Sequence, residues 1–175
     1  MQQPLYGLIG GKLGHSYSKI IHEKIADYTY ELLPLPTEAE ARTFMERRAF
    51  AAINVTIPYK HFVIPYCDVV DPKAQAIGAV NTIVNRDGKL YGYNTDYAGF
   101  AYLAEAHGVD FAGKTVLVLA PGASLAEETG RNAVAAAKAD CIVSANFCPE
   151  FCQPDYAFFT NSKRFEKLDL AALPC

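Results

Sequence analysis

The sequence predicts an α/β fold with a mostly parallel sheet. Short apolar runs typical of buried strands alternate with segments whose apolar residues recur at helical spacing, and this alternation continues through most of the 175 residues. A strand that is followed by a helix and then by a parallel strand commonly produces such a pattern. We place a boundary between two units near residue 100, with a first domain over residues 1–100 and a second unit over residues 101–175.

Short apolar strands are expected in the first domain over residues 5–9, 28–35 and 51–57. Ser16 and Ser18 are good N-cap residues, and the isoleucines after them lie at helical spacing, so a helix should begin there. Thr37 and Glu40 form a capping box for the next helix. Asp71 is followed by proline, which favours the first position of a helix, so a further short helix should open there.

The end of the first domain is predicted to be a hairpin that leads into a helix. Alternating side chains indicate strands over residues 79–84 and 89–93, and the Asp-Gly pair between them is a strong signal for a tight turn. The helix should run from about Tyr97 to His107, because a glycine follows and commonly ends a helix.

Composition and charge exclude several classes of function. The formal net charge of -3 argues against a nucleic-acid surface that is held by phosphate contacts. The longest apolar runs are too short to span a membrane, and the first residues resemble no secretory signal, so we expect a cytoplasmic protein. The five irregularly spaced cysteines predict free thiols. We expect no metal site, because no histidine follows the closely spaced Cys148 and Cys152.

Two hydroxyl side chains mark the start of the first predicted helix. The free backbone N–H groups and the dipole of a helix N-terminus favour an anion, and the hydroxyls of Ser16 and Ser18 would add donors. The alternative interpretation is ordinary helix capping by the same side chains.

Further polar residues follow the predicted strands, where ligands bind in open α/β sheets. Asn54 and Thr56 lie on one side of a strand end, because side chains alternate along a strand, and Lys60 follows just beyond a proline. Asn81 and Asp96 are polar residues among apolar and aromatic neighbours. The alternative is that these residues only form turns and that the lysine is solvated.

Four motifs occur in a specific order: Gly-His-Ser-x-Ser at residues 14–18, Asn-Val-Thr-Ile-Pro-x-Lys at 54–60, Gly-Ala-Val-Asn-Thr at 78–82 and Asn-Thr-Asp-x-x-Gly at 94–99. In combination they resemble the shikimate dehydrogenase family over roughly residues 5–119. Lys19 stands where that family frequently has proline.

The resemblance implies a role for each matching residue. Ser16 and Ser18 would bind the carboxylate of shikimate. The ring hydroxyls would be held by Asn54, Thr56, Asn81 and Asp96. Lys60 and Asp96 would form the catalytic pair, in which the lysine exchanges a proton with the reacting oxygen. The family reaction is the reversible, NADP-dependent reduction of 3-dehydroshikimate to shikimate, a step toward chorismate and the aromatic amino acids.

The second unit is expected to be a partial Rossmann-like unit. A buried strand over residues 114–119 should be followed by an alanine-rich helix over 124–138 and by a strand that ends near Ser144. Residues 148–175 show no clear alternation of strand and helix patterns. The resemblance gives Gly122 and Ala123 as the residues that would contact NADP.

The turn of this second unit departs from the pattern of the family. Residues 120–124 hold a single glycine and are one residue shorter than the family's turn, and Pro121 lacks an N–H that could face phosphate. Asn146 stands near the place where an arginine would meet the 2′-phosphate, and the family's late glutamine has no counterpart.

We therefore expect the chain as written to lack efficient NADP-dependent turnover. Either a shifted reading frame near codon 120 or a true divergence of the sequence would explain the departure of residues 120–124 from the family pattern. The alternative functions are a non-catalytic module that binds shikimate and a quinate/shikimate dehydrogenase.

Overall fold

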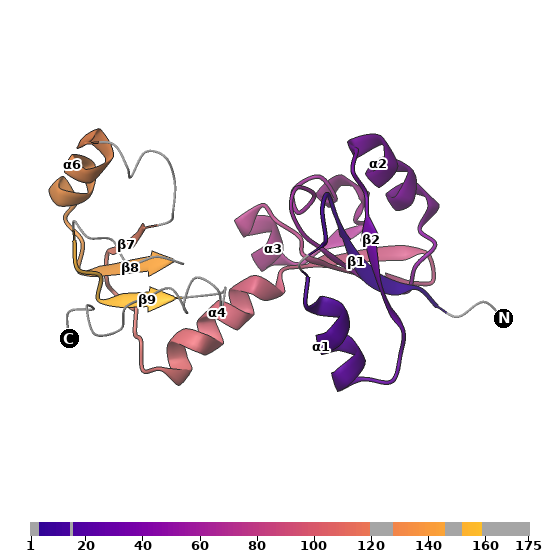
Figure 1. The fold of residues 1–175 in the computed structure, drawn as a ribbon, viewed down its shortest axis with the longest axis horizontal. Helices are drawn as coiled ribbons and strands as arrows, with labels where there is room; N and C mark the ends of the chain where they lie inside the picture. The colour runs from indigo at the N-terminus through magenta and orange to yellow at the C-terminus, as the bar shows by residue number, and fades with distance from the viewer. Residues whose placement is uncertain (1–3, 15, 120–127, 146–151, 159–175) are drawn as a thin grey trace. The chain divides into compact units, whose positions relative to one another are not determined.

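A computed structural model describes residues 4–14, 16–119, 128–145 and 152–158 (Figure 1). The chain divides into two units, Met1–His107 and Gly108–Cys175. Each unit has its own sheet, with six strands in the first and three in the second. The predicted α/β class with mostly parallel strands is confirmed in both sheets.

The sheet of the first unit is mixed, with three parallel and two antiparallel pairings. β1 pairs in parallel with β2 and β3, and β4 pairs in parallel with β6, while β5 is antiparallel to both β3 and β6. The order across the sheet is β2-β1-β3-β5-β6-β4. The strands are β1 Tyr6–Gly10, β2 Tyr30–Pro34, β3 Ala52–Val55, β4 Val69–Val70, β5 Thr82–Arg86 and β6 Lys89–Tyr93.

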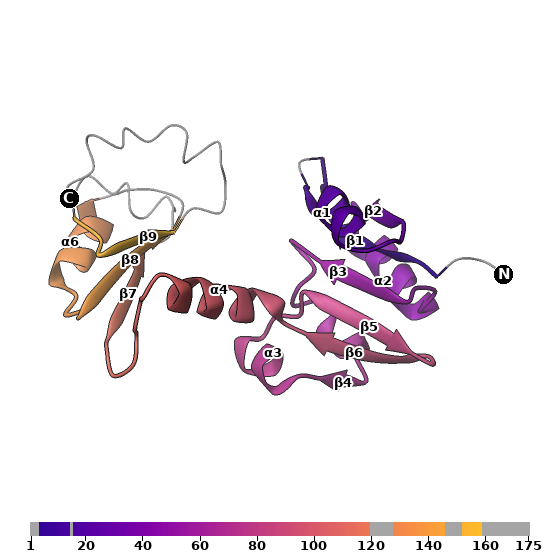
Figure 2. The same ribbon diagram turned by 90° about the horizontal axis from the view of Figure 1, so that it is seen from below.

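Helices cover both faces of this sheet, and α1 and α2 lie on opposite sides of strands β1 and β2 (Figures 1 and 2). The helices of the first unit are α1 Ser18–Ile25, α2 Glu38–Arg47, α3 Pro72–Ile77 and α4 Thr95–Ala106, with a 3-10 turn at Ile64–Tyr66.

Several local signals act as the sequence predicts. The Thr37 side chain accepts from the Glu40 backbone N–H and the Glu40 carboxylate accepts from that of Thr37, so the capping box is complete. Asp71 caps α3, with proline at the first helical position. Asp87 and Gly88 both have positive φ, at 53° and 84°, as the tight hairpin requires.

The cap of one helix and the start of another differ from the prediction. The N-cap of α1 is Tyr17, without a side-chain hydrogen bond, and the Oγ of Ser16 instead accepts from the backbone N–H of Ser18 at 3.2 Å. Helix α4 begins at Thr95, two residues before the predicted start, because the side chain of Asn94 accepts from the backbone N–H of Tyr97 and caps the helix.

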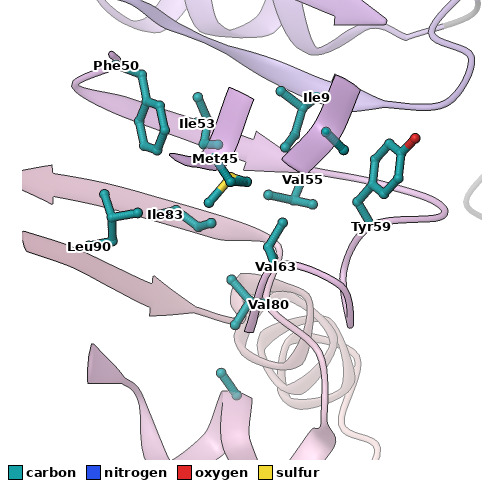
Figure 3. Close-up of a cluster of buried hydrophobic side chains, with 12 residues drawn as sticks. Ile9, Met45, Phe50, Ile53, Val55, Tyr59, Val63, Val80, Ile83 and Leu90 are labelled. Carbon is teal, nitrogen blue, oxygen red and sulfur yellow. The ribbon is translucent and has the colours of Figure 1, made fainter. Parts of the chain in front are cut away.

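The main core lies between the sheet and helices α2 and α3. Ile53 and Val55 of β3 point into it and meet Ala41 and Met45 of α2 (Figure 3). Because side chains alternate along a strand, Asn54 faces the opposite side of the sheet. The buried residues of that second side form a smaller cluster of Leu8, Leu13 and Tyr30. Strand β3 therefore separates an apolar core from the face that carries polar side chains.

The second unit contains three parallel strands, β7 Val116–Leu119, β8 Cys141–Ala145 and β9 Tyr156–Phe158, in the order β7-β8-β9. Helix α6, Glu128–Ala136, lies between β7 and β8 in the sequence. Strand β9 was not predicted, because three residues are too few to show a period, and its pairing with β8 defines it. None of the helices in the described part of the chain is long and apolar enough to cross a membrane.

An ion pair joins Arg48, after α2, to Asp68, before β4, and both residues also contact the β5–β6 hairpin. Nη1 of Arg48 donates to Oδ2 of Asp68 and to the carbonyl oxygen of Gly88, each at 2.7 Å. The backbone N–H of Leu90 donates to the same carboxylate oxygen at 2.7 Å. These contacts, first the Leu90 N–H and then the Arg48 guanidinium, hold the pKa of Asp68 below its ordinary value.

We expect this carboxylate to make the fold sensitive to acid. The pKa of Asp68 is lower in the folded state than in the unfolded chain, so its stabilisation is present above the unfolded pKa, near 3.8, and is lost as the pH falls below it. Asp68→Asn should lower the free energy of unfolding at pH 7 and lose less stability on acidification to pH about 3. Urea denaturation across this pH range measures both effects. Asp87→Asn makes the same charge change in the β5–β6 turn and should retain the wild-type profile. Identical profiles for the two variants would contradict the prediction.

Candidate functional site

Polar side chains gather where β3 ends, β5 begins and β6 ends. These three points lie at one edge of the sheet, because β5 is antiparallel to its two neighbours. The carboxyl ends of the parallel strands β1 and β3 lie at the same edge, which is the usual place for a ligand in an open α/β sheet. Asn54, Asn81, Thr82, Thr95 and Asp96 all belong to this edge.

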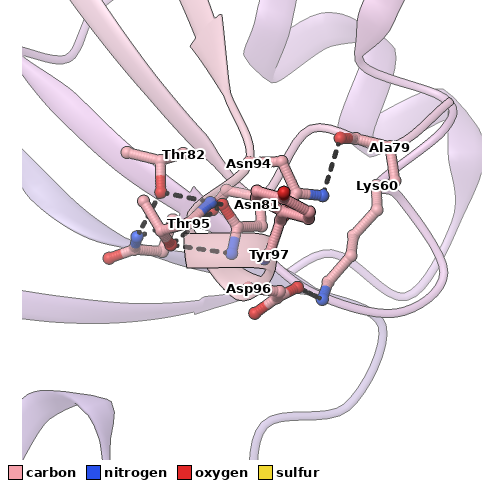
Figure 4. Close-up of polar contacts among 9 residues, drawn as sticks. Lys60, Ala79, Asn81, Thr82, Asn94, Thr95, Asp96 and Tyr97 are labelled. Atoms are coloured by element: carbon pink, nitrogen blue, oxygen red, sulfur yellow. Dashed lines mark hydrogen bonds and ion pairs between the residues drawn. The ribbon is translucent and has the colours of Figure 1, made fainter. Parts of the chain in front are cut away.

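Asn81 is the centre of the hydrogen-bond network in Figure 4. Only 7% of the residue is exposed, and its Oδ1 accepts from the backbone N–H of Thr95 at 2.9 Å and from Oγ1 of Thr82 at 3.1 Å. Its Nδ2 donates to Oγ1 of Thr95 at 2.9 Å. The amide therefore joins the start of β5 to the first residue of α4.

Asn54 continues this network across the sheet. Its Nδ2 donates to Oγ1 of Thr82 at 3.1 Å and contacts the carbonyl oxygen of Asn81 at 3.5 Å. Its Oδ1 accepts from the hydroxyl of Tyr30 at 2.7 Å. The 3.5 Å contact is long for a hydrogen bond, so the second proton of this amide is held only weakly.

Lys60 and Asp96 form an ion pair, with Nζ and Oδ2 separated by 2.5 Å (Figure 4). The side chains are 32% and 58% exposed, so a ligand can reach both. The carbonyl oxygen of Lys60 accepts from the backbone N–H of Val80 at 2.8 Å, which ties the lysine segment to the start of the Asn81 region. Asp96 lies in the first turn of α4, where the helix dipole favours a carboxylate.

Thr56 follows β3 directly, and its backbone N–H donates to the carbonyl oxygen of Ile9 at 2.9 Å. A Cβ added at Gly10 would lie 2.5 Å from Cγ2 of Thr56 and 2.8 Å from Leu13. Glycine at this position therefore makes room for the threonine side chain over the end of β1.

The two predicted anion-binding serines lie at the start of α1. Both are half-buried, and the Oγ of Ser16 accepts from the backbone N–H of Ser18. Ser16 also donates its own N–H to the carbonyl oxygen of Leu13, in the loop that follows β1. The structure thus brings Lys60 to Asp96 and Asn54 to Asn81, and it places the serines and Thr56 on the segments that follow β1 and β3.

The residues predicted to contact NADP, Gly122 and Ala123, lie outside the described residues. Around them, the strand–helix–parallel strand arrangement of β7, α6 and β8 is the framework on which dinucleotides bind, beyond the end of the first strand. Of the features that indicate NADP binding, the described residues contain only this framework of strands and helix. No group of three or more potential metal ligands occurs among the described residues.

Three residues of the network were not predicted from the sequence. Thr82 and Thr95 each follow an asparagine inside a recognised motif, so their position in the motif was a usable signal. Tyr30 carried no comparable signal, because an aromatic residue at a strand start is ordinary. Burial, and to a smaller extent Tyr28, raises the pKa of Tyr30, so its hydroxyl stays protonated and remains a donor at neutral pH.

Comparison with known proteins matches residues 8–83 to the shikimate dehydrogenase substrate binding domain. The NADP(+)-dependent shikimate dehydrogenase of Clostridium perfringens strain SM101 is 44% identical over 125 residues, which are 67% of this chain and 46% of that protein. The enzyme of the same name from Moorella thermoacetica is 39% identical over 154 residues, which are 83% of this chain and 51% of that protein. This chain thus spans about half the length of these curated relatives.

A solved structure shares the fold. The crystal structure of shikimate 5-dehydrogenase from Thermus thermophilus, in complex with NADP(H) and shikimate, superposes with a TM-score of 0.59 at 28% identity, covering 93% of this chain and 58% of that chain. The matched residues 8–83 include Lys60, Asn54 and Asn81, and Asp96, the partner of Lys60, follows them in α4. On the motifs, the fold and these relatives together, the chain belongs to the shikimate dehydrogenase family.

Proposed function

We propose that the first unit binds shikimate or 3-dehydroshikimate, and that in the whole protein it serves the reversible, NADP-dependent interconversion of the two. The observation that supports this most directly is the partly exposed ion pair between Lys60 and Asp96 beside the network of Asn81. It provides a proton donor, a carboxylate that orients it, and hydrogen-bonding groups for a polyhydroxylated ligand within one edge of the sheet.

The proposed chemistry assigns the proton to Lys60. Bound NADPH supplies the hydride. The ammonium group of Lys60 donates a proton to the carbonyl oxygen as it becomes a hydroxyl, and in the reverse direction the neutral amine accepts that proton. Asp96 accepts a hydrogen bond from Nζ and so holds the lysine in one orientation. Both residues are on the surface of the described unit, where the proton can exchange with water.

Recognition of the ligand is divided between two groups of residues. We propose that the hydroxyls of Ser16 and Ser18 donate to the ligand carboxylate, and that Asn54, Thr56 and Asp96 bind ring hydroxyls. Asn81 is buried and its amide is engaged by Thr82 and Thr95, so we propose that it holds these neighbours in place as well as meeting the ligand.

The setting that we propose is the cytoplasm. The described cysteines Cys67, Cys141 and Cys152 are free thiols, which fits a reducing compartment. Burial raises the pKa of the Cys67 thiol to about 11, so that thiol is unreactive.

Binding of shikimate should be detectable with this chain alone, because the proposed contacts lie in the first unit. At a concentration of about ten times Kd, linkage adds about 1.4 kcal/mol and raises the Tm by several degrees. Ser16→Ala should reduce this shift, since it removes a donor to the carboxylate. Thr43→Ala, an exposed hydroxyl on α2, is the matched control and should keep the full shift. A Tm that does not respond to millimolar shikimate would contradict the binding proposal.

Lys60→Ala should affect turnover far more than binding. General acid–base groups contribute about 10²–10⁴-fold, and their interaction belongs mainly to the transition state. The measurement needs an active protein, so the first unit is joined to the dinucleotide unit of a relative, and kcat and the shikimate Kd are compared. Near-normal kcat in Lys60→Ala would exclude the lysine from proton transfer. Lys24 is an exposed lysine of α1, and the control variant Lys24→Ala should leave kcat and the shikimate Kd unchanged.

The purified 175-residue chain should bind shikimate without efficient NADP-dependent turnover. The sequence of residues 120–124 motivates this second candidate function, a binding module. A single glycine limits how closely the backbone can approach the pyrophosphate, and Pro121 lacks an N–H that could face it. Absorbance of NADPH at saturating shikimate and NADP measures turnover. Rates of the order of 1–10³ s⁻¹, typical of enzymes, would refute the proposal of a non-catalytic binding module and favour an enzyme.

Comparison of the Kd values of shikimate and quinate decides which of the two ligands is preferred.

A further inference from the structure

Tyr30 contacts Asn54, which we propose to bind the ligand, and it also contacts helix α1, which begins at Ser18. It begins β2, only 2% of it is exposed, and its hydroxyl donates to Oδ1 of Asn54 at 2.7 Å. We propose that Tyr30 is a positioning residue, which sets the orientation of the Asn54 amide and at the same time fixes helix α1, with its serines, to the sheet. This inference deepens the proposed function and rests on it.

The hydrogen bonds on the Asn54 side have a single consistent direction. A phenol has one proton, and that of Tyr30 goes to Oδ1 of Asn54, so the Asn54 amide must turn its nitrogen toward Thr82. The proton of the Thr82 hydroxyl goes to Oδ1 of Asn81, so Oγ1 of Thr82 must accept from Asn54.

Without the phenol, this orientation would lose its support on one side. A reversed Asn54 amide would place its oxygen against Thr82, whose proton would then have to leave Asn81. The reversed amide would also leave the Tyr30 hydroxyl proton without its acceptor, which is costly in a buried position. The Tyr30 hydroxyl therefore favours the orientation in which the Asn54 nitrogen faces Thr82 and the carbonyl oxygen of Asn81. Burial raises the pKa of Tyr30, and the hydroxyl therefore stays a donor over the physiological range of pH.

The other side of Tyr30 holds α1. Nζ of Lys19 donates to the carbonyl oxygen of Tyr30 at 2.7 Å, and the backbone N–H of Tyr30 donates to Oε1 of Glu23 at 3.1 Å. The two side chains also pair with each other at 2.9 Å. The ring of His22 stacks on that of Tyr30, with centroids 4.1 Å apart and planes 13° from parallel.

These contacts matter because α1 has little other attachment. None of its residues is buried, and its isoleucines Ile20, Ile21 and Ile25 are 56%, 54% and 73% exposed. The contacts of Lys19, Glu23 and His22 with Tyr30 therefore attach the helix to the sheet. Ser18 is the first residue of that helix, so the position of the serines depends on Tyr30.

Tyr30→Phe in the 175-residue chain separates the hydroxyl from the rest of the side chain. The ring stack and both backbone contacts to α1 remain, and only the hydrogen bond to Asn54 is lost. The first readout is the side-chain amide signal of Asn54 in ¹H–¹⁵N NMR spectra without ligand, identified by its absence in Asn54→Ala. The second readout is the Kd for shikimate. We expect the amide signal to move and the Kd to rise by roughly 3- to 10-fold, the range of one hydrogen bond.

Two comparisons distinguish positioning from a general structural role. Tyr28→Phe removes a neighbouring, half-buried phenol that contacts His22 of α1 but not Asn54, and it should leave the Asn54 signal in place. In the Asn54→Ala background, Tyr30→Phe should no longer change the Kd, because the residue through which it acts is gone. An equal further loss of affinity in that background would overturn the proposal.

The outcomes also separate this inference from the proposed function. If the wild-type chain does not bind shikimate, the proposed function is wrong, and the Asn54 signal alone decides the role of Tyr30. An Asn54 signal that is unchanged in Tyr30→Phe overturns the inference even if shikimate binds. If Tyr30→Phe does not fold, the wild-type chain supplies the test: the hydroxyl proton of Tyr30 should exchange slowly with water, and rapid exchange overturns the inference.

Discussion

The arrangement of the candidate site depends on one buried amide. The side chain of Asn81 is removed from water, so each of its polar atoms needs a partner, and the available partners are Thr82 and Thr95. Satisfying the amide forces the first turn of α4 against the start of β5. Asp96 is the next residue of that turn, and its carboxylate is thereby brought to Lys60.

Strand β3 supplies the second constraint. Its residues alternate between the apolar core, which Ile53 and Val55 enter, and the polar face that carries Asn54. A shift of one residue in the pairing of β3 would place Asn54 in the core and an isoleucine or valine at the site. The packing that stabilises the domain and the position of a proposed ligand contact are thus set by the same register with β1 and β5.

The two halves of the proposed function belong to separate parts of the chain. The proposed ligand contacts and the proton-transfer pair lie in the first unit, most of them within the region that matches the substrate-binding domain. The framework for a dinucleotide lies in the second unit, where β7 and β8 pair in parallel. Binding and turnover are for this reason separate properties, and a chain with an intact first unit can retain one of them without the other.

The sequence by itself determined the local features and the order of the motifs. The capping box of Thr37, the hairpin at Asp87 and Gly88 and the cap of α3 depend on neighbouring residues, so their signals are readable in short windows. The motifs also identified Lys60, Asn81 and Asp96 as candidate site residues before any contact between them was known.

Only the tertiary structure decided which distant side chains meet. The contact of Tyr30 with Asn54 spans 24 residues and that of Lys60 with Asp96 spans 36, and neither leaves a periodic trace in the sequence. The predicted serine cap of α1 was wrong, because the Oγ of Ser16 accepts from the backbone N–H of Ser18 and Tyr17 is the N-cap. Local patterns report the preferences of the backbone, whereas these contacts depend on strand order and register, which are set by the burial of a core assembled from the whole unit.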